Sequence, residues 1–285
     1  MLKRRIIAGI VVKDGWAVQS IGFHRYLPLG DPAIIAETLD RWQVDEIVLF
    51  DIDATPRGTG PDIELIGRVS AAISTPLTAA GGVRTVEDAH NVISNGADKV
   101  AINTAAFHSP RLVRGIADLY GRQCVVASID VQRDPQGEAR LFNRWVPVPS
   151  VDVGEFARTL ADSGAGEILL NSVDRDGSKS GFDLELVRQV AAPLTAPLIV
   201  LGGAGKPEDI AEAVTVPGVA AVGAANFWTF SEHSVAQAKA LCEEKVGRIR
   251  VNERINYRGR SVARAGRTMP PEEAALDRMV GERLQ

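Results

Sequence analysis

Two short apolar runs, near the start and the middle of the chain, differ at one position where chemistry could be done. The run VVASID ends on Asp130, whereas the matching position of IIAGIV is Val11. A carboxylate at the end of a buried strand is a candidate general acid or base, because it can take or give a proton. A valine can do neither. The repeat therefore places a candidate proton-transfer group in one half of the chain and an aliphatic side chain at the equivalent position of the other.

The two runs belong to a repeat that extends through most of the chain. PDIELIGRV matches FDLELVRQV, TPLTAAGGV matches APLIVLGGA, and NTAAF matches GAANF. Asp62 aligns with Asp183 and Gly81 with Gly202, both at an offset of 121 residues. Val11 and Asp130 follow the same rule, with an offset of 119 residues. A nearly constant offset indicates two similar structural halves.

Short apolar runs alternate with longer amphipathic stretches along the repeat. The apolar runs are residues 5–12, 46–53, 75–81, 97–103, 124–131, 166–172, 196–203 and 219–225. The helix-like stretches are residues 31–42, 62–73, 85–95, 109–121, 153–164, 183–192 and 206–215. Continuous apolar strands are typical of buried parallel sheets, and eight strands close a barrel. We predict an α/β fold, a (β/α)8 TIM barrel of two repeated half-barrels, with a doubly wound open sheet as the alternative.

The composition is that of an ordinary water-soluble protein. Of the 285 residues 45% are hydrophobic, and the formal net charge is −4, which gives no bias toward nucleic acid. No apolar stretch approaches the roughly 18 residues of a membrane span, and the N-terminus does not read as a signal peptide. Cys124 and Cys242 lie outside any metal-ligand spacing. We expect a cytoplasmic protein with no membrane contact, nucleic acid, metal or cofactor.

The character of the chain changes after about residue 245. We expect the barrel to occupy residues 1–245, followed by an Arg-rich extension over residues 246–285. Residues 246–270 hold seven arginines and one glutamate, a net charge of +6, and a short helix is expected from Pro270. The extension is interpreted as solvated and partly flexible, with docking on an acidic partner as the alternative.

Glycine pairs stand where two of the predicted strands end. Gly81–Gly82 combines with Asn103–Thr104 one strand later, and Gly202–Gly203 combines with Ala224–Ala225 in the same way. Asp176–Gly177 borders the second group. Glycines let backbone N–H groups approach an anion closely. Their symmetric placement predicts two phosphate-binding sites, although glycines that only make tight turns are the simpler alternative.

Charged residues precede four of the strands, at the opposite end of the barrel. They are Arg5, Glu46, Lys99 and Glu167. Two cations and two anions at one mouth of a barrel can form a closed ring of ion pairs. Charges at this end of a barrel usually contribute to stability.

Seven segments are specific enough to carry a family resemblance. They are VKDG (12–15), GGVRTVEDA (81–89), GADKVAINTAA (96–106), SIDVQ (128–132), GAGEILLNSVDRDG (164–177), GFDLEL (181–186) and GGAGKPED (202–209). They closely resemble the cyclase subunit of imidazole glycerol phosphate synthase over about residues 1–240. The resemblance implies a barrel with two phosphate sites on its upper face. It also implies a glutaminase subunit docked below, which delivers ammonia through the barrel.

The resemblance also assigns roles to individual positions. Arg5, Glu46, Lys99 and Glu167 match that family's charged ammonia gate, and Asp98 and Gln123 match residues near the docking face. The positions that match the surroundings of the substrate are Asp51, Asn103, Thr104, Asp130, Asp176, Gly177, Gly203 and Ala224.

The departures from the family gather where its chemistry is done. The family's cyclase uses two carboxylates on opposite sides of its substrate. Asp130 matches one of them, and Val11 replaces the other. Gln19 stands in the place of a lysine near a phosphate, Asn171 replaces a threonine, and residues 143–150 replace a Gly-rich stretch. Losing one of two proton-transfer groups costs about 10²–10⁴-fold in rate, so the standard ring closure should be severely impaired.

This pattern leaves three functional hypotheses. A chain that keeps the gate residues but has an aliphatic residue in place of the first carboxylate resembles an offshoot of this family. The offshoot accompanies amidination of bacterial surface sugars. There the barrel carries ammonia from the glutaminase to a separate ATP-dependent sugar amidotransferase. The second hypothesis is a cyclase of histidine biosynthesis, a lyase, that uses another base. The third is a non-catalytic interaction protein that binds a phosphorylated molecule or phosphate.

Overall fold

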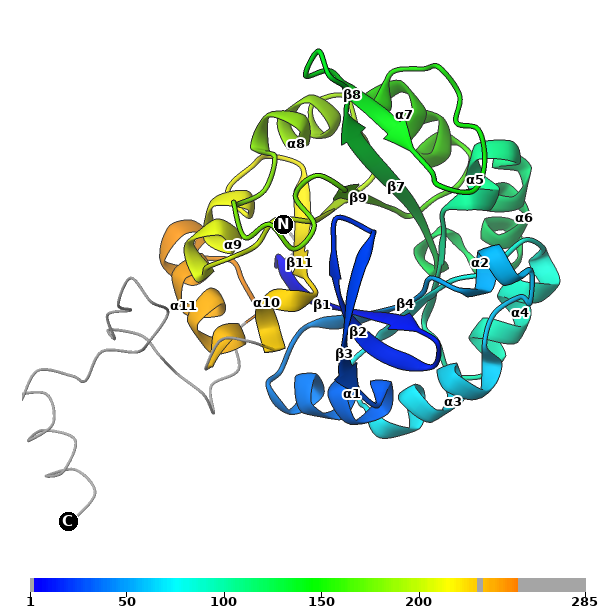
Figure 1. Cartoon of the computed structure of the whole chain (residues 1–285). Coiled ribbons are helices and arrows are strands. Elements are labelled where there is room, and N and C mark those ends of the chain that lie inside the picture. The colour runs from blue at the N-terminus through cyan, green and yellow to red at the C-terminus, as the bar shows by residue number, and fades with distance from the viewer. Residues whose placement is uncertain (1–2, 230–232, 251–285) are drawn as a thin grey trace, which may run out of the picture.

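The chain forms a closed barrel in the computed structural model, which describes residues 3–229 and 233–250 (Figure 1). Within these ranges eight parallel strands surround the barrel axis. In order they are β1 (Arg5–Lys13), β4 (Glu46–Asp51), β5 (Leu77–Ala80), β6 (Lys99–Ile102), β7 (Val125–Arg133), β9 (Glu167–Ser172), β10 (Leu198–Leu201) and β11 (Val219–Ala224). β11 pairs with β1, from Ala221 opposite Arg5 to Ala224 opposite Ala8. The predicted barrel is confirmed, and the open sheet is wrong because the sheet closes on itself.

Helices cover the outside of the barrel (Figure 1). The longer helices of the described residues are α1 (Pro32–Arg41), α3 (Ile63–Ala72), α4 (Val86–Ser94), α6 (Pro110–Tyr120), α7 (Val153–Asp162), α8 (Leu184–Ala191), α9 (Pro207–Ala213) and α11 (Ser234–Val246). The short ones are α2 (Ala54–Arg57), α5 (Thr104–His108), η1 (Arg122–Cys124) and α10 (Asn226–Thr229). All seven helix-like stretches predicted between residues 31 and 215 are present as helices, and α11 was not predicted.

The two halves repeat each other in detail. Asp62 caps α3 by accepting the backbone N–H of Leu65 at 2.9 Å, and Asp183 caps α8 in the same way from Leu186 at 3.1 Å. A side-chain acceptor at this position satisfies a backbone N–H that the helix itself leaves free. The half-barrel repeat read from the sequence is therefore confirmed.

A hairpin that was not predicted extends the first strand of each half. β2 (Trp16–Ile21) pairs antiparallel with β1 and with β3 (Arg25–Gly30), while β8 (Ala139–Phe142) pairs antiparallel with β7. In Figure 1 the β2–β3 hairpin lies in front of the barrel mouth. These hairpins build the walls of the upper face, where the carboxyl ends of the barrel strands meet.

The barrel interior is apolar through its middle. Inward-pointing side chains alternate along each strand, so Arg5, Ile7, Gly9 and Val11 follow one another up the inside of β1. The fully enclosed apolar cluster of the interior consists of Ile7, Val48, Ala101, Val126, Leu169, Ile199, Leu201 and Ala221. A larger cluster packs between the strands and the helices. The interior therefore separates a charged lower end from a polar upper end.

The chain after the last strand returns to the lower end of the barrel. The Lys239 ammonium of α11 lies 2.7 Å from a carboxylate oxygen of Asp45, and both side chains are buried. Beyond α11, Ile249 is buried and pairs with Arg4, whose N–H donates to the Arg248 carbonyl at 2.8 Å. Residues 251–285, with the expected helix from Pro270, lie outside the described residues, so the boundary at residue 245 stays a prediction.

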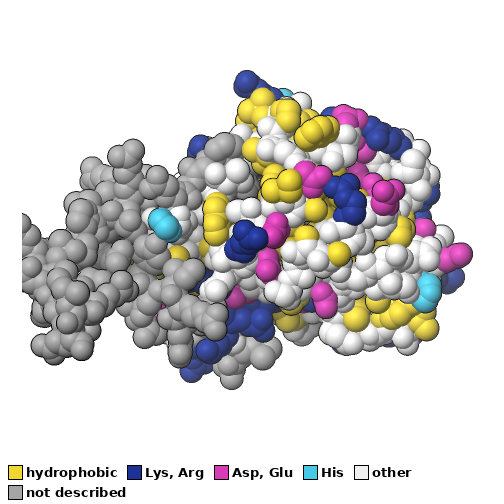
Figure 2. Space-filling model, turned by 90° about the horizontal axis from the view of Figure 1, so that it is seen from below, with side chains coloured by type: hydrophobic (Ala, Val, Ile, Leu, Met, Phe, Trp, Pro, Cys, Tyr) yellow, Lys and Arg dark blue, Asp and Glu magenta, His cyan; other side chains and the backbone are white. Residues whose placement is uncertain are grey.

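The flank formed by α1 and α3 carries charges of both signs, interspersed with apolar side chains (Figure 2). Arg41 pairs with Glu37, and Arg68 with Asp31, on this flank. In the described part of the chain, no helix is long and apolar enough to cross a membrane.

Candidate functional site

A cavity of about 590 Å³ opens at the upper face of the barrel. We call it the upper cavity. All the residues expected to carry chemistry or bind phosphate line it, from both halves of the chain: Val11, Asp51, Gly81, Gly82, Asn103, Thr104, Asp130, Asn171, Asp176, Gly177, Gly202, Gly203, Ala224 and Ala225. Ligand sites of barrels form at this end, because the loops after the strands converge there.

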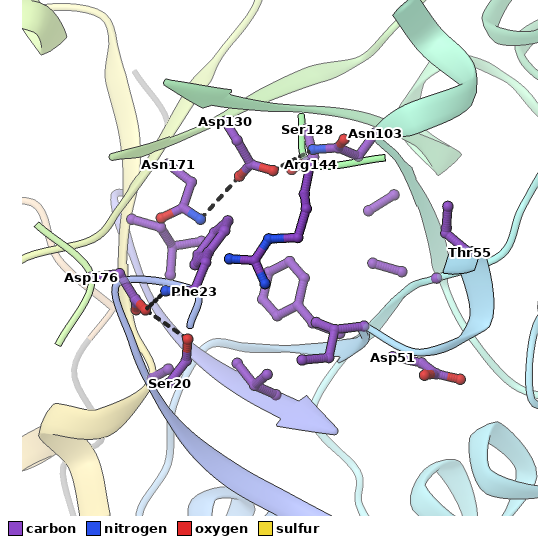
Figure 3. Close-up of a pocket in the computed structure, with 18 of the residues that line it drawn as sticks. Ser20, Phe23, Asp51, Thr55, Asn103, Ser128, Asp130, Arg144, Asn171 and Asp176 are labelled. Carbon is purple, nitrogen blue, oxygen red and sulfur yellow. Dashed lines mark hydrogen bonds between the residues drawn. The ribbon is translucent and has the colours of Figure 1, made fainter. Parts of the chain in front are cut away.

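Asp130 is held in a fixed orientation at the wall of the cavity (Figure 3). Its two carboxylate oxygens accept hydrogen bonds from the side-chain amides of Asn103 at 2.8 Å and Asn171 at 3.1 Å. Burial raises the pKa of the Asp130 carboxyl from 3.8 to about 6, although both amides oppose the rise. A carboxyl with this pKa can give or take a proton near neutral pH.

Val11 occupies the opposite wall. β1 and β7 are four strands apart in either direction around the closed sheet, so their inner faces look at each other. Val11 pairs with Phe50 of β4 and with Val18 of the hairpin, and both Val11 and Phe50 line the cavity. The wall facing Asp130 is therefore aliphatic and aromatic at this level.

Other carboxylates near Val11 are committed to structural contacts. Asp51 accepts the backbone N–H groups of Asp53 at 3.0 Å and Ala54 at 3.2 Å, which fixes the start of α2. Burial raises the pKa of Asp51, and in Figure 3 its carboxylate lies at the edge of the cavity. Asp14 is mostly exposed and pairs with Lys13 and Arg57. Asp14 is therefore paired with cations, and Asp51 has one carboxylate oxygen, Oδ1, tied to the backbone.

Asp176 is another partly buried carboxylate of the cavity, on the same side as Asp130. It accepts the Ser20 hydroxyl at 2.6 Å, and its backbone carbonyl accepts the Gly22 N–H at 3.1 Å. Burial raises the pKa of Asp176. These bonds tie the β2–β3 hairpin to the loop after β9, so Asp176 positions one wall of the cavity.

The glycine pairs adopt backbone conformations that other residues rarely reach. Gly82 has φ +71°, and a Cβ there would lie 2.5 Å from the carbonyl carbon of Gly60. Gly203 has φ +117°, and its Cβ would lie 2.2 Å from the carbonyl oxygen of Gly181. Positive φ and close backbone approach both require glycine. The close backbone packing fits the simpler interpretation, in which these glycines make tight turns. Phosphate binding at the two pairs stays a prediction.

The second glycine pair has an unpaired acceptor nearby. The Asn226 amide donates to the Ser20 carbonyl at 2.6 Å, whereas its Oδ1 has no hydrogen-bond partner among the described residues. Asn226 is buried and lines the cavity. A buried polar oxygen without a partner costs free energy unless a ligand or water donates to it. Asn226 is therefore a candidate binding group that the sequence did not reveal.

The loop after β8 contributes a second group that the sequence did not reveal. Arg144 and Trp145 line the cavity together with Phe23 and Tyr26 of the hairpin. Figure 3 shows the Arg144 side chain reaching into the middle of the cavity. The sequence did show that residues 143–150 depart from the family. It could not show that the Arg144 side chain points into the cavity, because that direction depends on contacts between loops.

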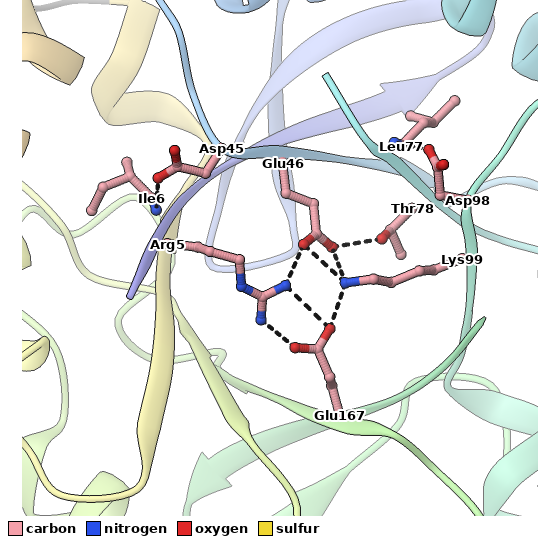
Figure 4. Close-up of polar contacts among 9 residues, drawn as sticks. All are labelled: Arg5, Ile6, Asp45, Glu46, Leu77, Thr78, Asp98, Lys99 and Glu167. Carbon is pink, nitrogen blue, oxygen red and sulfur yellow. Dashed lines mark hydrogen bonds and ion pairs between the residues drawn. The ribbon is translucent and has the colours of Figure 1, made fainter. Parts of the chain in front are cut away.

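The charged ring at the lower end closes as expected (Figure 4). Arg5 contacts Glu46 at 2.6 Å and also pairs with Glu167. Lys99 lies 3.0 Å from Glu46 and 2.6 Å from Glu167. Burial opposes ionisation of Glu167, but the charges of Arg5 and Lys99 hold its pKa below the ordinary value. We call these four residues the charged ring.

The two residues expected near a docking face lie at the same end of the barrel. Asp98 precedes β6 and accepts the Leu77 N–H at 2.8 Å. Gln123 lies in η1, before β7, and its amide donates to the Tyr120 carbonyl at 3.0 Å. Both positions flank the strand ends that carry the charged ring, so they share one face with it.

Among residues 3–229 and 233–250, no three His, Cys, Asp or Glu side chains gather into a potential metal site.

Comparison with known proteins matches the sequence to one family. The family described as histidine biosynthesis protein covers residues 5–232. A protein of Vibrio vulnificus (strain YJ016), provisionally named imidazole glycerol phosphate synthase subunit hisF2, is 39% identical over 259 residues, 90% of this chain and 94% of its own. Imidazole glycerol phosphate synthase subunit HisF of Hyphomonas neptunium is 44% identical over 240 residues, 84% of this chain and 95% of its own. The chain therefore belongs to the histidine biosynthesis protein family, among the HisF-like subunits of imidazole glycerol phosphate synthase.

Proposed function

We propose that this chain is the barrel subunit of a glutamine-dependent amidotransferase system in which its own ring closure is lost. A glutaminase subunit docks at the lower face, near Asp98 and Gln123, and releases ammonia from glutamine. The ammonia passes the charged ring and the barrel interior to the upper face. There it is handed to a separate acceptor enzyme, an ATP-dependent amidotransferase that acts on a sugar for a bacterial surface polysaccharide.

One observation carries the proposal: the charged ring is complete, whereas the wall facing Asp130 is Val11. Ring closure by the family's mechanism needs a proton-transfer group on each side of the substrate, and an aliphatic side chain supplies none. The route below the cavity is retained all the same. A subunit that has the charged ring but lacks the second carboxylate is better suited to deliver ammonia to another enzyme than to use it in its own ring closure.

The barrel interior suits the passage of ammonia rather than ammonium. The enclosed cluster from Ile7 to Ala221 is apolar, and moving a charged ammonium through it without a partner would be costly. Small residues reduce the bulk of the interior, since Gly9, Ala101, Gly223 and Ala221 lie among the larger side chains. Entry requires an opening in the charged ring, and Lys99 is its most exposed member, at 17% of its side chain.

A second candidate is cyclisation in histidine biosynthesis with a different base. The 44% identity with subunit HisF of Hyphomonas neptunium favours it, as does the pKa of Asp130 near 6. It requires another proton-transfer group to reach the ligand from the Val11 side. Both backbone hydrogen bonds of Asp51 reach its Oδ1, so its Oδ2 would have to face the ligand and act as the base.

The experiment combines the chain with a HisH-like glutaminase, glutamine and the bisphosphorylated ribulosyl aminoimidazole carboxamide intermediate. The proposal predicts a stable complex and stimulated glutamine hydrolysis, with ammonia released and almost no ring-closed product. Ring closure at an ordinary rate would support the second candidate. A chain that neither binds nor stimulates the glutaminase would contradict both and support a non-catalytic interaction protein.

A further inference from the structure

Arg144 enters the upper cavity from a loop that is anchored on one side of it. The loop follows β8, and Asn143 fixes its first turn. The Asn143 amide donates to the Asn103 side-chain oxygen at 2.9 Å and to the Thr104 hydroxyl at 3.1 Å. Its own oxygen accepts the backbone N–H groups of Trp145 at 2.9 Å and Val146 at 3.2 Å. Asn143 therefore holds the peptide on either side of Arg144.

The anchored turn aims the Arg144 side chain inward (Figure 3). The guanidinium lies in the middle of the cavity, in the view between Asn171 and Asp51. Its carbon is 6.0 Å from the centre of the Trp145 ring, within the range of a cation–π contact. Burial raises the pKa of the Tyr26 hydroxyl, whereas the charge of Arg144 lowers it. The arginine is thus positioned by neighbours that carry no negative charge.

The carboxylates described in the cavity do not form ion pairs with the Arg144 guanidinium. Asp130, Asp176 and Asp51 have their hydrogen bonds from amides, a hydroxyl and backbone N–H groups. Within the described residues, Arg144 forms no salt bridge with a carboxylate. Lys13, in contrast, pairs with Asp14 at 2.8 Å. The guanidinium therefore keeps N–H donors available for a ligand.

We propose that Arg144 binds a phosphate monoester in the middle of the upper cavity and sets its preference for phosphorylated ligands, with Asn143 as the residue that positions it. A guanidinium presents two parallel N–H groups that fit a phosphate. The inference rests on the proposed function only in treating this cavity as the place where a ligand binds.

The test measures binding of inorganic phosphate and of ribose 5-phosphate to the full chain by calorimetry. Arg144→Met keeps an unbranched apolar stem and removes the guanidinium, so it should weaken binding of both about tenfold or more. Arg144→Lys keeps the charge without the paired donors and should lie between. Asn143→Ala should weaken binding without changing a charge. Arg140→Met is the matched control, because Arg140 lies on β8, pairs with Asp134 and is mostly exposed.

A purely structural role for Arg144 makes a different prediction. It would lower the melting temperature of Arg144→Met equally with and without phosphate, whereas the proposal predicts loss of the rise in melting temperature that phosphate gives the wild type. The proposal is overturned if the wild type binds neither probe, or if Arg144→Met binds both as tightly as the wild type. Stimulation of the glutaminase tests the proposed function separately, so either idea can fail without the other.

Discussion

Asp130 and Val11 lie on opposite walls of one barrel, at equivalent positions of two repeated halves. Both stand near the ends of strands that continue into an antiparallel hairpin, β1 into β2 and β7 into β8. The repeat thus builds two equivalent positions around one cavity and places a carboxylate at only one of them. This asymmetry is the basis for expecting impaired ring closure.

The charged ring should couple glutamine hydrolysis to delivery of ammonia. Lys99→Met removes the cation that bridges Glu46 and Glu167 and leaves Arg5 to hold both carboxylates. We expect the glutaminase to lose most of its stimulation, about tenfold for loss of a charge-assisted contact. The measurement is glutamate formation by the complex, with ammonia release followed in parallel.

The control for this experiment is Arg140→Met, which removes an exposed cation at the other end of the barrel. Glu167→Gln should behave like Lys99→Met, because it breaks the same contacts from the other side. Melting temperatures identify any variant that loses stimulation by unfolding. Unchanged stimulation in both ring variants would argue against a role for the ring in coupling.

Asp130 should lower stability at neutral pH. Its folded pKa, about 6, lies above its ordinary value of 3.8, so the folded state holds the proton more tightly than the unfolded state. Its contribution to stability is then greatest below about pH 4 and falls as pH rises toward 6. Asp130→Asn should stabilise the chain at pH 8 by up to about 2 kcal/mol, provided that the Asn171 amide turns to accept a hydrogen bond.

Urea unfolding of both proteins at pH 4 and pH 8 checks this expectation, and the difference should nearly vanish at pH 4. Asp134→Asn is the matched control. Its hydrogen bond with Arg140 lowers the pKa of Asp134, so that substitution should cost stability at pH 8 and not gain it. If Asp130→Asn has a lower free energy of unfolding than the wild type at pH 8, the ionised Asp130 carboxylate does not destabilise the folded state.

Gly82 should be required for packing as well as for conformation. A methyl group at Gly82 would collide with the backbone of Gly60, whereas Gly137 has a similar φ of +87° and nothing described within 4 Å. Both alanine variants share the cost of a positive φ, about 1 kcal/mol. Gly82→Ala should lose several kcal/mol in addition, and equal losses in the two variants would contradict the close approach.

The barrel could be predicted because its signals are local and repeated. Continuous apolar strands such as residues 46–51 and capping aspartates such as Asp62 appear at regular intervals in the sequence. α11 was missed because its buried face includes the polar Gln237 and Lys239. The lysine is stabilised there by Asp45, which is far away in the sequence. No periodicity within one helix can reveal such a partner.

The candidate site was predicted in part for the same reason. Residues at strand ends, such as Asp130 and Asn171, were placed correctly because a barrel brings all its strand ends together. Arg144 and Asn226 were missed. Arg144 points inward because Asn143 bonds to Asn103 and Thr104, and the open acceptor of Asn226 arises from its contact with Ser20. Both depend on contacts between loops.

Ring closure by the isolated chain, at saturating ammonia and with the bisphosphorylated ribulosyl aminoimidazole carboxamide intermediate, measures most directly what an aliphatic residue at position 11 costs. Val11→Asp should exceed the wild type by about 10²-fold or more, while Val11→Asn, similar in size but unable to exchange the proton, should stay at the wild-type rate. A wild type that already turns over as fast as Val11→Asp would contradict the account.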